Sequence, residues 1–108
     1  MRVLFDHGTP APLQEFLRPD HEIRQAKAQG WDRLENGELL AAAEAAGFDV
    51  LVTTDKNIRY QQNLTVRTIA IVVLGNPQWP VLKHHVHLVV SAVNATTPGS
   101  YAEVDIPQ

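Results

Sequence analysis

The run from Thr68 to Leu74 restricts the fold of this chain more than any other segment, because it is almost entirely apolar and rich in β-branched residues. The turn-forming residues Gly75, Asn76 and Pro77 follow it directly. A short run that is apolar at consecutive positions is typical of a central strand in a parallel sheet. Helices must cover both faces of such a strand, so the run favours an α/β architecture.

Shorter apolar runs alternate with amphipathic segments along the rest of the chain. We expect strands at residues 1–5, 21–25, 48–53, 68–74 and 101–106, and helices at 9–18, 36–46 and from residue 80 to before residue 97. Residues 56–63 are predicted to be a loop or a short helix. Strands that alternate with helices form right-handed βαβ units. The pattern therefore predicts a three-layer α/β/α sandwich with a mostly parallel sheet and an edge strand at the C-terminus.

Local signals refine these helices. Thr9 and Asn36 are the predicted N-caps of the first and second helices, because their side chains can accept hydrogen bonds from free backbone N–H groups. Leu13, Phe16 and Leu17 form the predicted buried stripe of the first helix. The third helix is predicted to begin at Pro80 and to run without a break past Val93.

Composition limits the classes of function that the chain can have. Its 108 residues are 44% hydrophobic and 19% charged, as expected for one globular domain at residues 1–108. The sequence has no cysteine, which excludes disulfides, thiolate zinc sites and thiol catalysis. Apolar runs are too short for a signal peptide or a membrane span, so we expect a cytoplasmic protein without membrane contacts. With a net charge of −3, binding to nucleic acid would depend on a local basic cluster.

Three acidic residues occupy positions that an α/β fold can bring together. Asp6 and Asp55 each follow a predicted strand, and Glu38 lies in the first turn of a predicted helix. If the first strand lies between the second and third, both aspartates meet at the carboxyl edge of the sheet, where open α/β sheets bind ligands. Carboxylate oxygens suit Mg²⁺ or Mn²⁺, and Asn57 could add a neutral oxygen. Each acid also has a structural explanation, since all three residues can cap turns or a helix.

Other polar residues lie beside these acids. His7 follows Asp6 and could serve as an auxiliary acid or base, or simply form a hydrogen bond with the backbone. Lys56 and Arg59 could hold RNA phosphates, and Tyr60 could stack on a base. The alternative for these three residues is a solvated loop, which is equally consistent with the sequence.

Residues 36–57 place the acid Glu38 at the start of an apolar helix and then a T-x-D-x-[DN] motif at Thr53, Asp55 and Asn57, and residues 2–6 form a short apolar run that ends at an acid. These two stretches resemble PIN domains, in which residues 2–6 would correspond to the opening strand and first acid. The whole chain is similar to short, compact PIN-like proteins. This resemblance implies a Mg²⁺- or Mn²⁺-dependent ribonuclease that cleaves single-stranded or structured RNA. It also implies the toxin of a bacterial toxin–antitoxin pair, with an antitoxin protein as partner.

Two other functions fit parts of the pattern. One is a non-catalytic PIN-like binding module, because longer PIN domains carry more acids than this chain does. The other is a receiver-like domain phosphorylated on Asp55, although the chain lacks a lysine between Gly75 and Val81 that this fold would use. The apolar helices and the edge strand also offer surfaces for a homodimer.

Overall fold

The protein forms one five-stranded sheet in a computed structural model that describes residues 1–61 and 63–107. The strand order is β2-β1-β3-β4-β5, and neighbouring strands in this order are parallel. The strands are β1 (Arg2–Phe5), β2 (Glu22–Gln25), β3 (Val50–Thr53), β4 (Ala70–Leu74) and β5 (Tyr101–Val104). The predicted α/β class, the interior position of residues 68–74 and the C-terminal edge strand are therefore confirmed.

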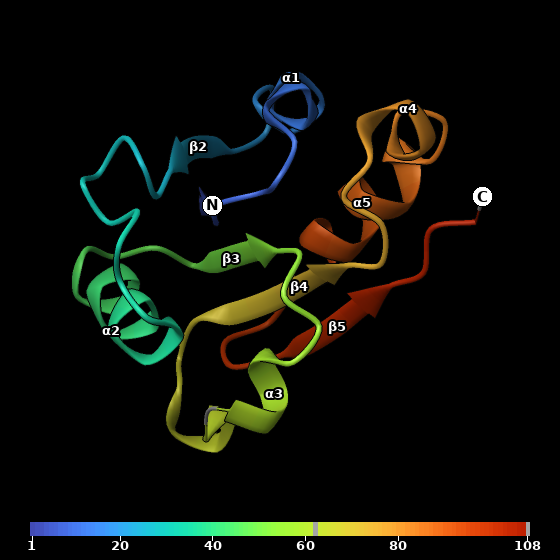
Figure 1. Cartoon of the computed structure of the whole chain (residues 1–108). Coiled ribbons are helices and arrows are strands. Elements are labelled where there is room, and N and C mark those ends of the chain that lie inside the picture. The colour runs from blue at the N-terminus through green and yellow to red at the C-terminus, as the bar shows by residue number, and fades with distance from the viewer. Residues whose placement is uncertain (62, 108) are drawn as a thin grey trace.

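Helices cover both faces of this sheet, which makes the three-layer sandwich that the sequence predicts (Figure 1). The helices α1 (Gln14–Leu17), α4 (Trp79–Leu82) and α5 (Val86–Asn94) lie over one face, and α2 (Asn36–Ala45) and α3 (Ile58–Gln61) lie over the other. Two short 3₁₀ turns, η1 (Ala11–Leu13) and η2 (Leu64–Val66), complete the connections. Within the described residues, each helix is too short or too polar to cross a membrane.

Alternation along the strands divides the buried residues between two cores. In β3, Val50 and Val52 face the core under α1 and α5, whereas Leu51 faces the core under α2. All three side chains are fully buried. Successive strand residues point to opposite faces, so a strand that is covered on both sides is apolar at consecutive positions. This requirement explains why the central strands lack the polar alternation of half-exposed strands.

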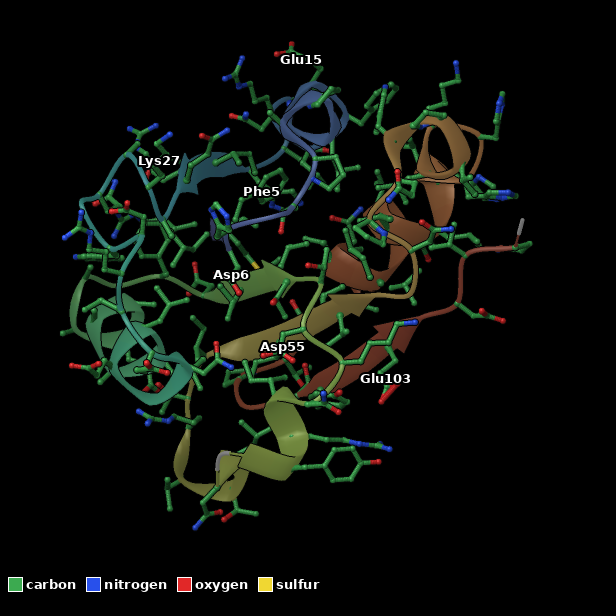
Figure 2. All side chains as sticks on the ribbon, viewed as in Figure 1. Phe5, Asp6, Glu15, Lys27, Asp55 and Glu103 are labelled. Carbon is green, nitrogen blue, oxygen red and sulfur yellow. The ribbon has the colours of Figure 1, made fainter. Side chains whose placement is uncertain are left out.

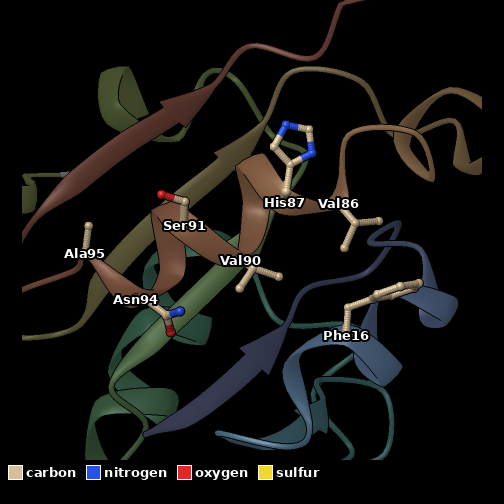
Figure 3. Close-up of a pocket in the computed structure, with 7 residues that line it drawn as sticks. All are labelled: Phe16, Val86, His87, Val90, Ser91, Asn94 and Ala95. Carbon is tan, nitrogen blue, oxygen red and sulfur yellow. The ribbon is translucent and has the colours of Figure 1, made fainter.

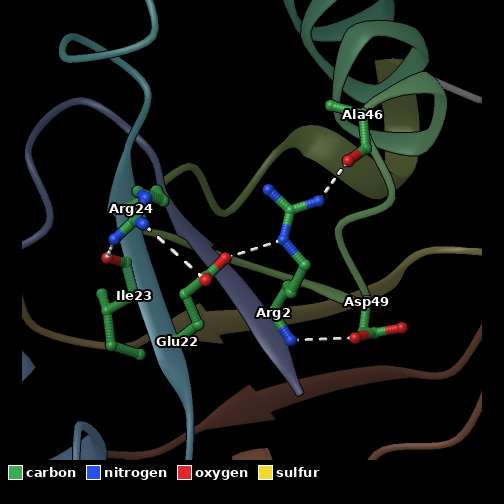
Figure 4. Close-up of polar contacts among 6 residues, drawn as sticks. All are labelled: Arg2, Glu22, Ile23, Arg24, Ala46 and Asp49. Carbon is green, nitrogen blue, oxygen red and sulfur yellow. Dashed lines mark hydrogen bonds and ion pairs between the residues drawn. The ribbon is translucent and has the colours of Figure 1, made fainter.

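The amino edge of the sheet is held by Arg2 at the start of β1 (Figure 4). Its backbone N–H donates to Asp49 at 2.8 Å, and its guanidinium group binds Glu22 at 2.8 Å and the carbonyl oxygen of Ala46. The same guanidinium lies 4.4 Å from the ring centre of Phe48. The hydrogen bond from Arg2 lowers the pKa of the Glu22 carboxyl group. Arg2 therefore ties β2 and α2 to β1 at the edge opposite the predicted acid site.

Three local predictions about the helices are wrong. Phe16 was predicted to be buried, but it is 50% exposed and contacts Trp79 with 6.1 Å between ring centres. The helix here is a 3₁₀ turn followed by a four-residue α-helix, and Thr9 does not cap it, because its hydroxyl donates to the carbonyl oxygen of Val52. The cap of α2 is Glu35 rather than Asn36.

The predicted long helix beginning at Pro80 is also wrong, because the structure divides it into α4 and α5. His85 has φ −130° and ψ 22°, which lies outside helical geometry and interrupts the backbone hydrogen bonding. In the predicted loop or short helix at 56–63, α3 occupies Ile58–Gln61, and residue 62 lies outside the described residues.

Candidate functional site

Asp6 occupies the position directly after β1, where the sequence predicts it. Its backbone N–H donates to the carbonyl oxygen of Val52 at 2.9 Å, so Asp6 remains aligned with β3. Its Oδ1 accepts the backbone N–H of His7 at 2.7 Å, and its Oδ2 accepts the hydroxyl of Thr53 at 2.7 Å. Thr53 is the last residue of β3 and is 0% exposed. A buried donor therefore fixes one oxygen of this carboxylate.

Thr53 also connects Asp6 to Asp55. The backbone N–H of Asp55 donates to the Thr53 hydroxyl oxygen at 3.1 Å. The side chain of Asp55 accepts the backbone N–H of Asn57 at 2.9 Å through Oδ1 and the amide of Asn36 at 2.7 Å through Oδ2. A carboxylate oxygen has two lone pairs, so each of the four aspartate oxygens can accept one more ligand. The structure thus brings both predicted aspartates to one place, on the loops after β1 and β3 (Figure 2).

This place is the point where the direction of the connections changes. The chain leaves β1 toward α1 on one face of the sheet and leaves β3 toward α3 on the other (Figure 1). Such a switch point opens a crevice at the carboxyl ends of the strands. Gly8 has φ +91°, and an added Cβ there would lie 3.3 Å from Thr54 Oγ1, so a residue without a side chain suits this close approach. The fold therefore positions both aspartates where α/β proteins bind ligands.

Glu38 takes part in a capping box at the start of α2. Its Oε1 accepts the backbone N–H of Glu35 at 3.3 Å, and the side chain of Glu35 caps the N–H of Glu38 in return. This reciprocal capping box satisfies two free donors of α2. In residues 1–61 and 63–107, no three His, Cys, Asp or Glu side chains are grouped in a way that could hold a metal ion. From α2, it is Asn36 whose side chain contacts Asp55.

The cations predicted to bind RNA lie in and beside α3. Lys56 is exposed. Arg59 forms an ion pair with Glu103 at 3.2 Å, donates to the hydroxyl of Tyr60 and lies 4.6 Å from that ring centre. Tyr60 is 72% exposed, so its ring is accessible to a base. Burial, together with a hydrogen bond to Glu103, raises the pKa of Tyr101 to about 12.

Arg67, another cation near the acids in sequence, belongs to the scaffold. Its guanidinium binds Glu44 at 2.8 Å, and the two side chains are only 20% and 19% exposed. Glu44 also accepts hydrogen bonds from Thr68 and from the backbone N–H of Ile69. Burial acts to raise the pKa of Glu44, but the hydrogen bonds from Arg67 and Thr68 outweigh it and lower this pKa to about 2. The pair joins α2 to the segment that enters β4.

Sequence reasoning missed two residues of this region, Asn36 and Lys27. The sequence pattern indicates only a helix cap at Asn36. Lys27 lines a pocket of about 140 Å³ together with Asp6, His7 and Gln25. One signal was available for Lys27: it comes two residues after a predicted strand that neighbours the strand ending at Asp6.

A larger pocket of about 790 Å³ lies between α1 and α5, lined by Phe16, Val86, His87, Val90, Ser91, Asn94 and Ala95 (Figure 3). His87 is the one titratable side chain among these lining residues. The pocket is a broad apolar depression, and a catalytic site needs convergent polar groups. We therefore place the candidate site at the aspartates instead.

Comparison with known proteins gives no match: no family model matches the chain, and no significant match is found among curated proteins or solved structures.

Proposed function

We propose that this chain is a Mg²⁺- or Mn²⁺-dependent endoribonuclease whose site is built on Asp6 and Asp55. One observation carries the proposal: both aspartates lie at the switch point of the sheet, where the buried Thr53 hydroxyl donates to the Asp6 carboxylate and accepts the backbone N–H of Asp55. The PIN-like pattern of the sequence supports the same activity. By that resemblance, the proposal extends to the toxin of a toxin–antitoxin pair and to an antitoxin protein as its partner.

The donor set fits the proposed ion. The candidate ligands are carboxylate oxygens, which Mg²⁺ and Mn²⁺ prefer over nitrogen or sulfur. A Mg²⁺ ion is commonly held by one or two carboxylates, and waters and substrate phosphates complete its shell. Two aspartates therefore suffice for one such ion. Asn36 and Asn57 flank Asp55 and could supply or orient a further oxygen ligand.

The ion, when bound, would activate a water and offset charge on the phosphoryl oxygens. The protein residues would perform the other tasks. Thr53 would hold Asp6 in position, because its hydroxyl donates to Oδ2. His7 lines the pocket beside Asp6 and would exchange a proton with a reacting oxygen. Lys56, Arg59 and Tyr60 would bind the RNA strand after it passes Asp55.

The decisive experiment is a cleavage assay on single-stranded RNA with Mn²⁺, in which wild type is compared with Asp6→Asn and Asp55→Asn. We expect wild type to cut and both variants to lose at least about 100-fold in rate, because each loses an anionic ligand. Asp105→Asn is the matched control, since Asp105 is an exposed acid that also follows a strand at the same edge. Equal cutting by all four proteins would refute the proposal.

A non-catalytic PIN-like binding module is the second candidate, and the capping role of Glu38 favours it. With Glu38 engaged by Glu35, the crevice holds fewer acids than a two-metal site requires. Calorimetry separates the two functions. A binding module should bind RNA without taking up Mn²⁺, whereas the nuclease should take up the ion, and Asp6→Asn should abolish the uptake.

A further inference from the structure

A small pocket opens at the carboxyl ends of β1 and β2, on the side of Asp6 away from Asp55. Its lining includes Asp6, His7, Gln25 and Lys27, and its volume is about 140 Å³. Pockets for whole small molecules usually measure about 300–1,000 Å³. This one is large enough only for a single chemical group.

The position of Lys27 in this pocket is fixed by the backbone. The N–H of Ala26 donates to the carbonyl oxygen of Phe5 at 2.9 Å, and these two residues come directly before Lys27 and Asp6. Ala26 is 1% exposed, and its carbonyl oxygen accepts the N–H of Trp31 at 2.9 Å. Because Ala26 is anchored in this way, Lys27 must leave the sheet beside Asp6.

The ammonium group of Lys27 differs from most other cations of the protein. Among residues 1–61 and 63–107, ion pairs hold Arg2, Arg18, Arg24, Arg59 and Arg67, and none holds Lys27. Lys27 is exposed and lies at the wall of a pocket that also contains a carboxylate. An ammonium group with three donors readily binds phosphate oxygens as a compact charge.

We propose that Lys27 binds a backbone phosphate of the RNA strand in this pocket, a role that rests on the proposed nuclease function. Lys27 lies on the β2 side of the aspartates and Lys56 lies on the β3 side. The strand would therefore cross the carboxyl edge of the sheet from Lys27, past Asp6 and Asp55, to Lys56. Phosphate contacts on both sides would hold the intervening phosphodiester at the aspartates.

Fluorescence anisotropy with a labelled single-stranded RNA tests this role in the cleavage-deficient Asp55→Asn background, which leaves the pocket intact. We expect Lys27→Ala to weaken binding by about five-fold, equally for different RNA sequences. The slope of log affinity against log salt concentration should fall by about 0.7, the value for one phosphate contact to a single strand. Lys27→Arg should retain most of the affinity. Lys83→Ala, at an exposed lysine after α4, should match the parent protein.

The outcomes separate this proposal from the nuclease proposal. If Lys27→Ala and Lys83→Ala bind RNA equally well, the role of Lys27 is refuted even when wild type cleaves RNA. If Lys27→Ala binds more weakly while wild type fails to cleave, the role of Lys27 stands and the nuclease proposal fails. An unchanged RNA affinity together with tighter Mn²⁺ binding in Lys27→Ala would identify Lys27 as a counter-ion of Asp6 and overturn the inference. Failure of the parent protein to bind RNA would overturn it as well.

Discussion

Thr53, which is 0% exposed, donates its hydroxyl hydrogen to Oδ2 of Asp6 at 2.7 Å and accepts the backbone N–H of Asp55 at 3.1 Å. The hydroxyl can donate only once, so these two contacts fix its orientation. One buried group thereby sets the relative position of the loops after β1 and β3. The geometry of the candidate site depends on this threonine, although its buried hydroxyl is not accessible to a ligand.

Thr53→Val should test that dependence, because valine has nearly the same shape but no hydroxyl. The change leaves the Asp55 N–H without its acceptor and removes a hydrogen bond to a charged group, so we expect a loss of about 1–3 kcal/mol in unfolding free energy. Urea unfolding measures this loss. Thr54→Val makes the same change one residue later, outside this pair of hydrogen bonds, and should have a smaller effect. Equal effects at the two positions would contradict the role of Thr53.

Glu38→Gln should distinguish a helix cap from a metal ligand. Glutamine can complete a capping box, so the free energy of unfolding should change by less than about 0.5 kcal/mol, whereas Glu38→Ala should lose about 0.5–2 kcal/mol. If Glu38 acts only as a cap, Mn²⁺ affinity and RNA cleavage should be the same in Glu38→Gln and wild type. A large loss of Mn²⁺ affinity in Glu38→Gln would instead restore Glu38 to the metal site, as the sequence predicts.

The sheet and the two aspartates were predictable because their signals are local. Val50–Thr53 and Ala70–Leu74 are apolar at nearly every position, which identifies them as strands. Asp6 and Asp55 follow the carboxyl ends of β1 and β3, so the positions of these strands determine where the two aspartates lie. The contact of Asn36, rather than Glu38, with Asp55 was not predictable, because it depends on the capping box that turns Glu38 toward Glu35.

Other features depend on contacts that are distant in sequence. Lys27 lies beside Asp6 only because β2 pairs with β1 in one register, Phe5 with Gln25. The break between α4 and α5 depends on the backbone conformation of His85. The connecting residues Lys83, His84 and His85 include no proline or glycine, so the sequence does not indicate a break there. Phe16 has the spacing of a core residue but lies at the margin of a very short helix. Periodicity alone cannot place such marginal residues.

Glu44→Gln should reveal an acid-sensitive contact in the scaffold. The pKa of Glu44 is lowered from 4.5 to about 2 in the folded protein, so its stabilising effect is complete above pH 4.5 and is lost as the pH falls toward 2. A pKa shift of this size would correspond to about 3 kcal/mol in unfolding free energy. Because the side chain is partly exposed, the contribution should be reduced to about 1–2 kcal/mol. The difference in unfolding free energy between wild type and Glu44→Gln should therefore be constant near neutral pH and shrink below pH 4.5.

Glu15→Gln provides the control for Glu44. Glu15 also forms an ion pair at 2.8 Å, with Arg18, but the two side chains are 69% and 56% exposed. Exposed pairs contribute little to stability, so its removal should leave the pH profile nearly unchanged. A profile for Glu44→Gln that parallels wild type between pH 4.5 and 2 would show that the Arg67 contact does not stabilise the fold.

Asn36→Asp should strengthen metal binding more than any other single change at the site. Asn36 contacts Oδ2 of Asp55 at 2.7 Å, so the substitution would place a third carboxylate there and remove a donor. Without metal, the adjacent charges should destabilise the protein by about 1–3 kcal/mol. With Mn²⁺ at 100 times its dissociation constant, binding of the ion should raise the free energy of unfolding by about 2.7 kcal/mol. Thermal unfolding with and without Mn²⁺ measures both effects.

Asn57→Asp adds the same charge on the other side of Asp55 and completes this comparison. Only the backbone N–H of Asn57 is seen to bind Asp55, and its side chain is exposed, so the new carboxylate should raise Mn²⁺ affinity less than Asn36→Asp does. Calorimetric titration of the two variants ranks them directly. The opposite ranking would make Asn57 the amide at the ion, as the sequence motif predicts, and would assign Asn36 to orienting Asp55 alone.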